Sequence, residues 1–324
     1  MKEHKGVTAL LRAAEQEHRC AIGEGDGGGA GKAIYRALRR RVKALEVTSP
    51  YPNLFADVMY WNSLNPEERS MHMIRALAKL HPQWTFAGLS AACIYGYQHA
   101  YSLHDGSVSI ASMRGPGTGA AKQLRHIYMH AIPRWKCQGL PVTSPARTLV
   151  DCASIPFANA LAIYDSALRS GHVTAADVKT LSVQVNCDEA AIGKLLKHAD
   201  PLRENGGESW AYANIVELGY AEPVSQVEFT NPNNSAMPYR VDFCWRLADG
   251  RIIVAEYDGM AKYADITNPN RASLQAKMEY DRNRERDLKS QGVTVITHLF
   301  FEDIVHSARL NAKLSDSGVP RIRR

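Results

Sequence analysis

The sequence of 324 residues contains no uninterrupted run of about 18 apolar residues and no C-x-x-C pair. We therefore expect no membrane span, and the charged start of the chain, M-K-E-H-K, lacks the hydrophobic segment of a secretion signal. The six cysteines are scattered, which favours reduced thiols in a cytoplasmic protein over a disulfide framework or a zinc site. Hydrophobic residues make up 45% and charged residues 22% of the chain, an ordinary globular composition that excludes a disordered, collagen-like or coiled-coil protein.

Positive charge exceeds negative charge only in the first two thirds of the chain. The sequence holds 39 Lys and Arg against 33 Asp and Glu, a formal net charge of +6. Residues 1–83 contain 13 basic and 9 acidic residues, 84–200 contain 10 and 7, and 201–324 contain 16 and 17. A mild basic excess suits an anionic partner such as nucleic acid, but it is also common on proteins that bind no such partner. These three ranges are the domains that we expect.

The clearest loop signal in the sequence is the glycine-rich segment 23–31. It reads G-D-G-G-G-A-G-K and leads into a helical pattern, so a phosphate-binding P-loop has to be considered. The spacing excludes that motif, because Asp26 stands where the first glycine belongs and Ala33 follows Lys32 in place of Ser or Thr. No apolar strand precedes the loop either. We interpret the segment as a flexible linker.

A basic helix is predicted directly after this loop. Apolar residues recur at helical spacing over 33–44, and four cationic residues at i, i+3, i+4 and i+7 form a second face. The next segment predicts two short strands, 45–48 and 53–56, around the turn S-P-Y-P. A helix followed by a small hairpin is typical of a winged helix, which inserts its helix into the DNA major groove; the alternative is a solvated basic helix that only packs inward. The candidate DNA-binding residues are Arg36, Arg39, Arg40 and Lys43.

The middle range predicts two strands and then several short helices. Alternating apolar residues mark the strands at 108–112 and 124–130, on either side of the loop R-G-P-G-T-G. Ser144 and Pro145 have the residue types of a helix cap and first helical position. Further helices are expected at 157–169, from a capping box that begins at Thr174, and at 188–198. We interpret these helices as structural.

From about residue 201 onward the predicted order is helix, three strands, helix, strand and helix. Asp249-Gly250 between two apolar runs is a specific hairpin signal, and Gly292 is typical of the end of a helix. The expected fold class of the whole chain is therefore α+β with several domains. The expected ranges are helix 208–218, strands 224–229, 239–247 and 251–257, helix 271–291, strand 293–299 and a last helix from 301.

Acidic residues occur in this last region where a metal-dependent nuclease needs them. Asp242 lies on the first hairpin strand, and Glu256 and Asp258 on the second point to the same face of an extended chain. Such carboxylates repel one another unless a cation offsets their charge. Their hard oxygen ligands suit Mg²⁺ or Mn²⁺, which holds a phosphate oxygen and activates a water. Glu208 on the preceding helix is a fourth candidate; the alternative is a solvent-facing hairpin with ordinary surface acids.

The order of these elements resembles the PD-(D/E)XK nuclease superfamily, most closely its branch similar to the very-short-patch-repair (Vsr) endonucleases. The resemblance covers roughly residues 205–305 and implies a restriction-endonuclease-like α/β domain within 201–324. It implies that Asp242, Glu256 and Asp258 bind metal and take part in catalysis. The residues that carry it are Glu208, Gln226, Y-R-V-D-F up to Phe243, V-A-E-Y-D-G-M-A-K up to Lys262, D-R-N-R from Asp281 and G-V-T-V-I from Gly292.

One departure from the superfamily pattern leaves two alternatives for this domain. Asp258 stands in place of the lysine of E-x-K, which helps to orient and deprotonate the attacking water. In an active Mg²⁺- or Mn²⁺-dependent DNase, Lys262 or Lys277 would supply that positive charge and Lys262 would stabilise the phosphate. In the other alternative the domain has kept the fold and DNA binding without cleavage. Arg282, Arg284 and Arg286 on the long helix are candidate DNA-backbone contacts, or else solvated or ion-paired surface arginines.

Residues 33–182 resemble the AbiEi-type antitoxins of abortive-infection toxin–antitoxin systems. The resemblance is carried by the basic helix with its P-Y-P-N-L-F-A wing, by L-S-A-A-C-I-Y-G at 89–96 and by G-L-P-V-T-S-P-A-R-T-L-V-D at 139–151. It implies a winged-helix-like DNA-binding region within 1–83, an AbiEi-like α/β domain within 84–200, and a cognate toxin as a partner. The function expected is a DNA-binding regulator of the toxin–antitoxin or phage-defence type fused to a nuclease-fold domain. The alternatives are an active metal-dependent DNA endonuclease and a module that neutralises a toxin without DNA.

Overall fold

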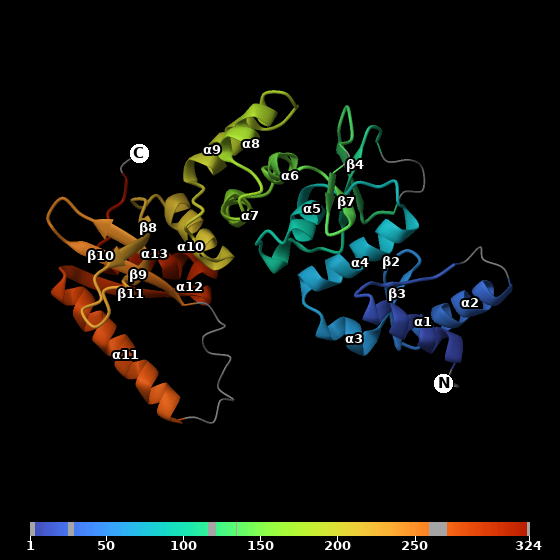
Figure 1. The fold of residues 1–324 in the computed structure, drawn as a ribbon, viewed down its shortest axis with the longest axis horizontal. Helices are drawn as coiled ribbons and strands as arrows, with labels where there is room; N and C mark the ends of the chain where they lie inside the picture. Colours follow the sequence, from blue (N-terminus) through green and yellow to red (C-terminus); the bar gives the residue numbers. More distant parts are fainter. Residues whose placement is uncertain (1–3, 25–28, 116–120, 134, 259–270, 323–324) are drawn as a thin grey trace. The chain divides into compact units, whose positions relative to one another are not determined.

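The computed structural model describes residues 4–24, 29–115, 121–133, 135–258 and 271–322. Contacts divide the chain into two compact units, unit 1 with residues 1–154 and 172–192, and unit 2 with residues 155–171 and 193–324 (Figure 1). Both units combine helices with small sheets, so the α+β class predicted from the sequence is confirmed. The division into three domains at 83 and 200 stays a prediction. Part of the glycine-rich loop, 25–28, and Lys262 lie outside the described residues.

The first part of unit 1 consists of two helices and a three-stranded antiparallel sheet with the strand order β1-β3-β2. The predicted basic helix and hairpin are both present, but the predicted position of the turn is wrong. Ser49, Pro50 and Tyr51 lie within β2, and the turn passes through Pro52 and Asn53, which is in the left-handed region at φ 61°. Leu38 and Phe55 are fully buried between the helices and the sheet. The elements are α1 (Lys5–Gln16), β1 (Ala21–Ile22), α2 (Gly29–Lys43), β2 (Val47–Tyr51) and β3 (Leu54–Asp57).

The second part of unit 1 has a core of its own around α4 and α5. Asn65 caps α4 through a capping box with Glu68, and Pro66 occupies the first turn, where a missing N–H costs nothing. Ile74, Phe86 and Ile94 are fully buried in this core. The elements are α3 (Val58–Ser63), α4 (Pro66–Leu80), α5 (Gly88–Tyr95), η1 (Tyr101–Leu103), the parallel pair β4 (Val108–Ser112) and β5 (Leu124–Tyr128), the antiparallel pair β6 (Trp135–Cys137) and β7 (Leu140–Val142), α6 (Pro145–Cys152) and α8 (Ala175–Ser182).

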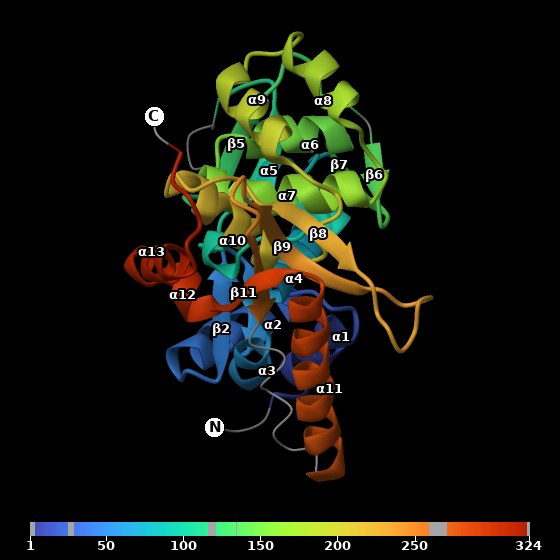
Figure 2. The same cartoon turned by 90° about the vertical axis from the view of Figure 1, so that its left-hand side faces the viewer.

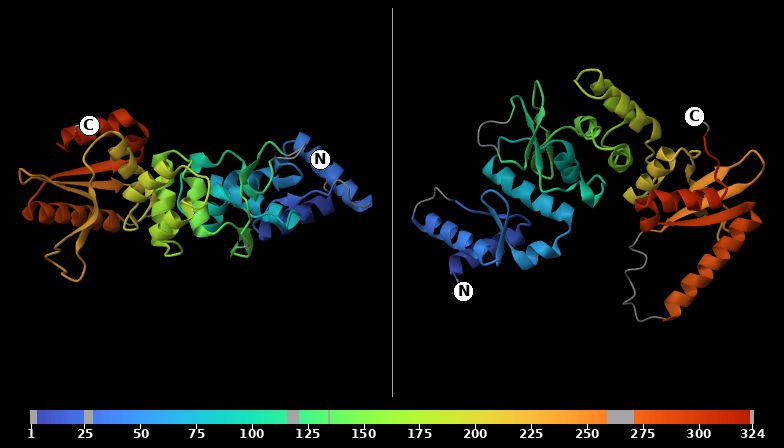
Figure 3. Two further views of the ribbon diagram at one scale, coloured as in Figure 1. Left: turned by 90° about the horizontal axis from the view of Figure 1, so that it is seen from above. Right: turned by 180° about the vertical axis from the view of Figure 1, so that it is seen from behind.

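Unit 2 is built on a four-stranded mixed sheet with the order β11-β10-β9-β8, in which β10 and β11 are parallel and the other pairs antiparallel. Figure 3 shows α11 and α13 on opposite faces of this sheet, and Figure 2 shows the N-terminal half of α11 extending beyond the strands. The elements are α7 (Phe157–Arg169), α9 (Glu189–His198, which begins in unit 1), α10 (Gly206–Glu217), β8 (Val224–Phe229), β9 (Tyr239–Arg246), β10 (Ile252–Asp258), α11 (Arg271–Ser290), β11 (Val293–Phe300), α12 (Phe301–Val305) and α13 (Ser307–Asp316).

Two expectations from the sequence, reduced cysteines and no membrane span, can be compared with the structure. All six cysteines are free. Within the described part of the chain, no helix has both the length and the apolar character needed to cross a lipid bilayer.

Candidate functional site

Strands β9 and β10 bring the predicted acidic residues of unit 2 together. Glu256 and Asp258 alternate onto one face of β10, and Glu256 is the register partner of His298 on β11. Asp242 on β9 lies against the same strand, because its Oδ2 accepts a hydrogen bond of 2.7 Å from the amide of Tyr257. With Glu208 from α10, these residues form what we call the carboxylate cluster.

Gln226 joins two members of the carboxylate cluster. Its Nε2 donates hydrogen bonds to Oε2 of Glu208 at 2.9 Å and to Oδ1 of Asp242 at 3.2 Å. The backbone of Gln226 is in the left-handed region, φ 55°, in the middle of β8 and directly across from Asp242. A non-glycine residue in that conformation inside a strand is strained and persists only where its surroundings hold it. The strain turns the Gln226 side chain toward the two carboxylates.

The start of α10 places Glu208 in the interior. The side chain of Asn205 caps the helix by accepting hydrogen bonds from the amides of Gly207 at 2.9 Å and Glu208 at 3.0 Å. A side chain at Gly207 would overlap the ring of Tyr257, so only glycine lets the helix end approach β10 this closely. Glu208 is consequently 3% exposed, and one of its oxygens accepts from the amide of Glu204 at 2.8 Å.

Two side chains that can carry a positive charge, Arg284 and His298, pair with the carboxylate cluster. Arg284 of α11 donates to Oε1 of Glu256 and to the carbonyl of Arg240, both at 2.7 Å. His298 of β11 lies 2.8 Å from Asp258 through its Nδ1. Two alternatives were predicted for Arg284, a DNA-backbone contact and a solvated or ion-paired surface arginine. The structure shows an ion pair with Glu256, and the DNA contact stays a prediction. The alternating pattern of β11 beside β10 is the signal that places His298 opposite Glu256.

Burial disfavours negative charge in the carboxylate cluster. Desolvation, together with the charge of Asp242, raises the pKa of Glu208 to about 8. Desolvation also raises the pKa of Glu256 to about 7, although Arg284 acts in the opposite direction. The hydrogen bond to Asp258 raises the pKa of His298. Near neutral pH the cluster therefore favours an added proton or a cation.

The donor set fits Mg²⁺ or Mn²⁺ in chemical type. Asp242, Glu256 and Asp258 offer hard carboxylate oxygens. Among the described residues, these three do not bring their ligand atoms within 4.8 Å of one another. In this arrangement Glu256 is paired with Arg284 and Asp258 with His298.

The cationic residues of α2 form an exposed surface in unit 1, which we call the basic face. Within the described part of the chain, no carboxylate lies within 4.0 Å of their charged atoms, whereas the neighbouring Arg41 pairs with Glu46 at 3.7 Å. The residues of the basic face are Arg36, Arg39, Arg40 and Lys43.

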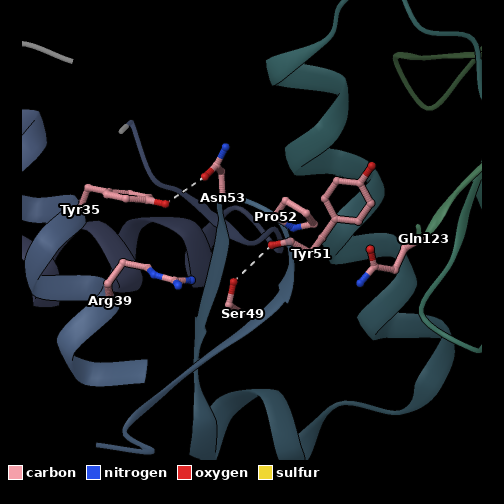
Figure 4. A pocket seen from close by; sticks show the side chains of 7 residues that line it. All are labelled: Tyr35, Arg39, Ser49, Tyr51, Pro52, Asn53 and Gln123. Atoms are coloured by element: carbon pink, nitrogen blue, oxygen red, sulfur yellow. Dashed lines mark hydrogen bonds between the residues drawn. The ribbon is translucent and has the colours of Figure 1, made fainter. Parts of the chain in front are cut away.

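A small pocket lies between the basic face and the hairpin. It has a volume of about 390 Å³, and in Figure 4 the side chain of Arg39 extends from α2 beside it. The hydroxyl of Tyr35 donates to Oδ1 of Asn53 at 3.3 Å, which joins the helix to the hairpin turn. The lining residues are Tyr35, Arg39, Ser49, Tyr51, Pro52, Asn53 and Gln123.

The other two predicted DNA contacts on α11 differ from Arg284. Arg282 and Arg286 are exposed, and Arg286 lies 3.8 Å from Asp287. Asp287 is itself buried, but at that distance it holds the exposed side chain of Arg286 only weakly. These two arginines are therefore accessible to an anionic partner.

Comparisons of this chain with protein-family models, with curated protein sequences and with solved structures found no match.

Proposed function

We propose that this chain is a DNA-binding protein in which α2 and the β2–β3 hairpin engage duplex DNA, joined to a nuclease-fold domain. The observation that carries the proposal is the basic face, Arg36, Arg39, Arg40 and Lys43, which is exposed and has no acidic partner among the described residues. The sequence resemblance to AbiEi-type antitoxins supports a regulator of the toxin–antitoxin or phage-defence type. A cognate toxin is the proposed protein partner, and co-purification with a neighbouring gene product tests it.

The chemistry of the basic face suits the DNA backbone. Guanidinium and ammonium groups spaced along one side of a helix neutralise successive phosphates and release counterions. The pocket beside Arg39 adds the polar groups of Ser49 and Asn53, which suit hydrogen bonds to phosphate oxygens or base edges. Helix and hairpin together resemble the two contact elements of a winged helix.

The test is a salt titration of duplex binding followed by fluorescence anisotropy. The triple variant Arg36→Ala, Arg39→Ala, Arg40→Ala is expected to bind at least about tenfold more weakly, with a salt slope smaller by about 3, because each lost phosphate contact removes about one unit. A matched variant, Lys136→Ala, Lys179→Ala, Lys197→Ala, removes the same charge from exposed positions elsewhere and is expected to keep affinity and slope. Equal losses in both triple variants would show that only net charge matters and would remove α2 from the proposal.

A second candidate function is metal-dependent DNA cleavage by unit 2. The observation that favours it is the carboxylate cluster, in which Asp242 and Glu256 converge from adjacent strands with raised proton affinity at Glu256. When bound, Mg²⁺ or Mn²⁺ would hold a phosphate oxygen and lower the pKa of a water. Asp242, Glu256 and Asp258 would be the ligands, and His298 is a group that can hold or release a proton beside Asp258.

A supercoiled-plasmid assay with Mg²⁺, Mn²⁺ or EDTA tests this second candidate. We expect metal-dependent nicking by the wild type, its loss in Asp242→Asn and Glu256→Gln, and its retention in Glu228→Gln, an exposed carboxylate on β8. Gel retardation is measured on the same samples. Retardation without nicking would mean a regulator that carries a silent nuclease fold, and nicking that survives both variants would place the activity at another site.

A further inference from the structure

Three potential metal ligands converge in unit 1, far along the sequence from the carboxylate cluster. Sγ of Cys93 lies 3.5 Å from Nε2 of His99 and 3.9 Å from Nε2 of His104, and the two Nε2 atoms are 2.7 Å apart. Among the described residues, this is the group of three whose ligand atoms all lie within 4.8 Å of one another. Cys93 is 4% exposed, and both histidines are half-buried.

The remaining ring nitrogens have partners that fix the orientation of both imidazoles. Nδ1 of His99 lies 2.5 Å from the carbonyl of Tyr97, which can only accept, so this nitrogen carries the proton. Nε2 of the neutral ring is then a lone pair directed at the cluster. Nδ1 of His104 lies 2.8 Å from Oγ of Ser70 on α4. Outer partners of this type orient the histidine ligands of metal sites.

We propose that Cys93, His99 and His104 bind one zinc ion, with a water or a fourth side chain completing the coordination. One sulfur and two imidazole nitrogens are the donor set that zinc accepts, whereas Mg²⁺ requires hard oxygens. The separations of 3.5 and 3.9 Å between sulfur and nitrogen allow all three atoms to contact one ion at the usual distances of about 2.3 Å for sulfur and about 2.0 Å for nitrogen. The two Nε2 atoms need only move slightly apart.

Zinc binding has to displace protons from this cluster. Because Nε2 of His99 has a lone pair, Nε2 of His104 carries the proton of the 2.7 Å contact between them. When His104 binds zinc, its ring keeps a proton on Nδ1, which donates to Oγ of Ser70. Burial, with smaller contributions from Glu67 and Cys152, raises the pKa of the Cys93 thiol well above its ordinary value. Zinc binding therefore displaces the thiol proton to solvent, and the thiolate forms the bond to the metal.

Zinc at this position would fasten a loop to the core of unit 1. Cys93 lies in the last turn of α5, and His99 and His104 lie in the segment around η1 that follows it. Through Ser70, the same cluster reaches α4. The spacing Cys-x5-His-x4-His contains no C-x-x-C pair, so the pattern of cysteines did not indicate a zinc site.

The test is titration of the metal-free, tag-free full chain with Co²⁺ and Zn²⁺. We expect one Co²⁺ per chain with a thiolate-to-cobalt charge-transfer band, and displacement of that band by Zn²⁺. The band is expected to vanish in Cys93→Ser, and affinity to fall at least tenfold in His99→Gln and His104→Gln. Cys20→Ser, which removes another buried thiol, is expected to bind like the wild type.

Thermal unfolding separates loss of the site from loss of the fold. Zinc is expected to raise the melting temperature of the wild type and of Cys20→Ser but not of His104→Gln, while all three melt alike in EDTA. An absent charge-transfer band in the wild type, or the same band in the Cys93 and His104 variants, would overturn the proposal. In that case the cluster would be a hydrogen-bonded set of one thiol and two imidazoles.

Discussion

Arg203 is the largest buried side chain that carries a full charge in unit 2. It is 1% exposed, and its partner Asp165 is fully buried. Nε of Arg203 donates to Oδ2 of Asp165 at 2.6 Å and Nη2 donates to Oδ1 at 3.0 Å, a bidentate pair. Nη2 also donates to the carbonyl of His198, and the guanidinium lies 4.1 Å from the ring centroid of Tyr212. The pair thus joins α7 to the segment before α10.

Removing the charge of only one partner of this buried pair is expected to lower the free energy of unfolding strongly. Asp165→Asn leaves the Arg203 charge in the interior without a counter-charge, so we expect a loss of about 3–5 kcal/mol in the free energy of unfolding. Urea unfolding of the full chain followed by circular dichroism measures it. Asp249→Asn, which breaks an exposed pair with Arg251, is expected to change the free energy of unfolding far less. A similar cost for both variants would contradict the role given to burial.

Burial of Glu208 makes the stability of unit 2 depend on pH in a predictable direction. Its pKa is raised to about 8 in the folded chain by burial and by Asp242, while the unfolded chain loses the proton near 4.5. Between these values the folded state binds more protons than the unfolded state, so the free energy of unfolding in EDTA falls as pH rises from about 4.5 to about 8. Glu256, with a pKa of about 7, acts in the same direction. Arg169 and Arg203 act in the opposite direction, without cancelling the effect.

Glu208→Gln, which resembles the protonated acid, tests this pH dependence. At pH 4 the variant is expected to match the wild type, and at pH 8 to exceed it by of order 1 kcal/mol or more. Urea unfolding at both pH values measures the difference. The exposed Glu228→Gln is the control and is expected to show no such pH-dependent gain. A wild-type advantage that is equal at both pH values would mean that Glu208 is already charged in the folded state.

Three residues on one face of helix α11 lie directly against the sheet. Arg284 pairs with Glu256, Asp287 accepts a hydrogen bond of 3.0 Å from the hydroxyl of Tyr239, and Leu288 is buried with 1% exposure. Their spacing of i, i+3 and i+4 places them on the same side of a helix. Of the two residues between Arg284 and Asp287, Arg286 is exposed, and Oε1 of Glu285 lies 3.7 Å from Nε2 of His298 on β11. The C-terminal half of α11 therefore both packs the sheet and positions the cation of the carboxylate cluster.

The apolar contact is expected to contribute most to this packing. Leu288→Ala removes a side chain from the cluster that includes Val254 and Val293, and we expect a loss of about 3–5 kcal/mol in the free energy of unfolding. Lys289→Ala, on the exposed side of the same helix, is expected to change stability by less than about 0.5 kcal/mol. Thermal and urea unfolding measure both. Comparable effects would show that α11 contacts the sheet loosely in solution.

Helices and strands that have a clear hydrophobic periodicity or a capping box were predicted correctly from the sequence. Helix 157–169 and strand 224–229 have the predicted bounds, and the Thr174 capping box precedes α8 as expected. The strands β1, β6 and β7 were not predicted, because two or three residues are too few to show an alternating pattern. Their pairing depends on neighbours that the local sequence does not reveal.

In the carboxylate cluster too, contacts within neighbouring strands could be predicted, but contacts between separate elements could not. Alternation along β10 predicted that Glu256 and Asp258 share a face, and the hairpin predicted that Asp242 is adjacent. The pairing of Arg284 with Glu256 was not predictable, because it depends on how α11 packs on the sheet. The zinc cluster of unit 1 was missed for a similar reason, since a turn around η1 brings its histidines back to Cys93.

At the scale of the whole molecule, unit 2 is discontinuous in sequence. It takes α7 from residues 155–171 and the rest from 193 onward, while 172–192 belong to unit 1. Helix α7 packs against α10 and buries Leu161, Ile163 and Tyr164 completely. A boundary at 201, predicted from the order of elements along the sequence, would separate these residues and Asp165 from Arg203.

Two fragments decide where the boundary of unit 2 falls. The fragment 155–324 retains α7 and the Asp165–Arg203 pair, so we expect it to unfold in urea with one cooperative transition. The fragment 201–324 leaves Arg203 and one face of α10 uncovered, and we expect it to lose more than about 5 kcal/mol, which is comparable with the whole stability of a small domain. Circular dichroism at increasing urea measures both. If 201–324 unfolds at the same urea concentration as 155–324, then α7 adds nothing to the fold of unit 2 and the boundary at 201 is correct.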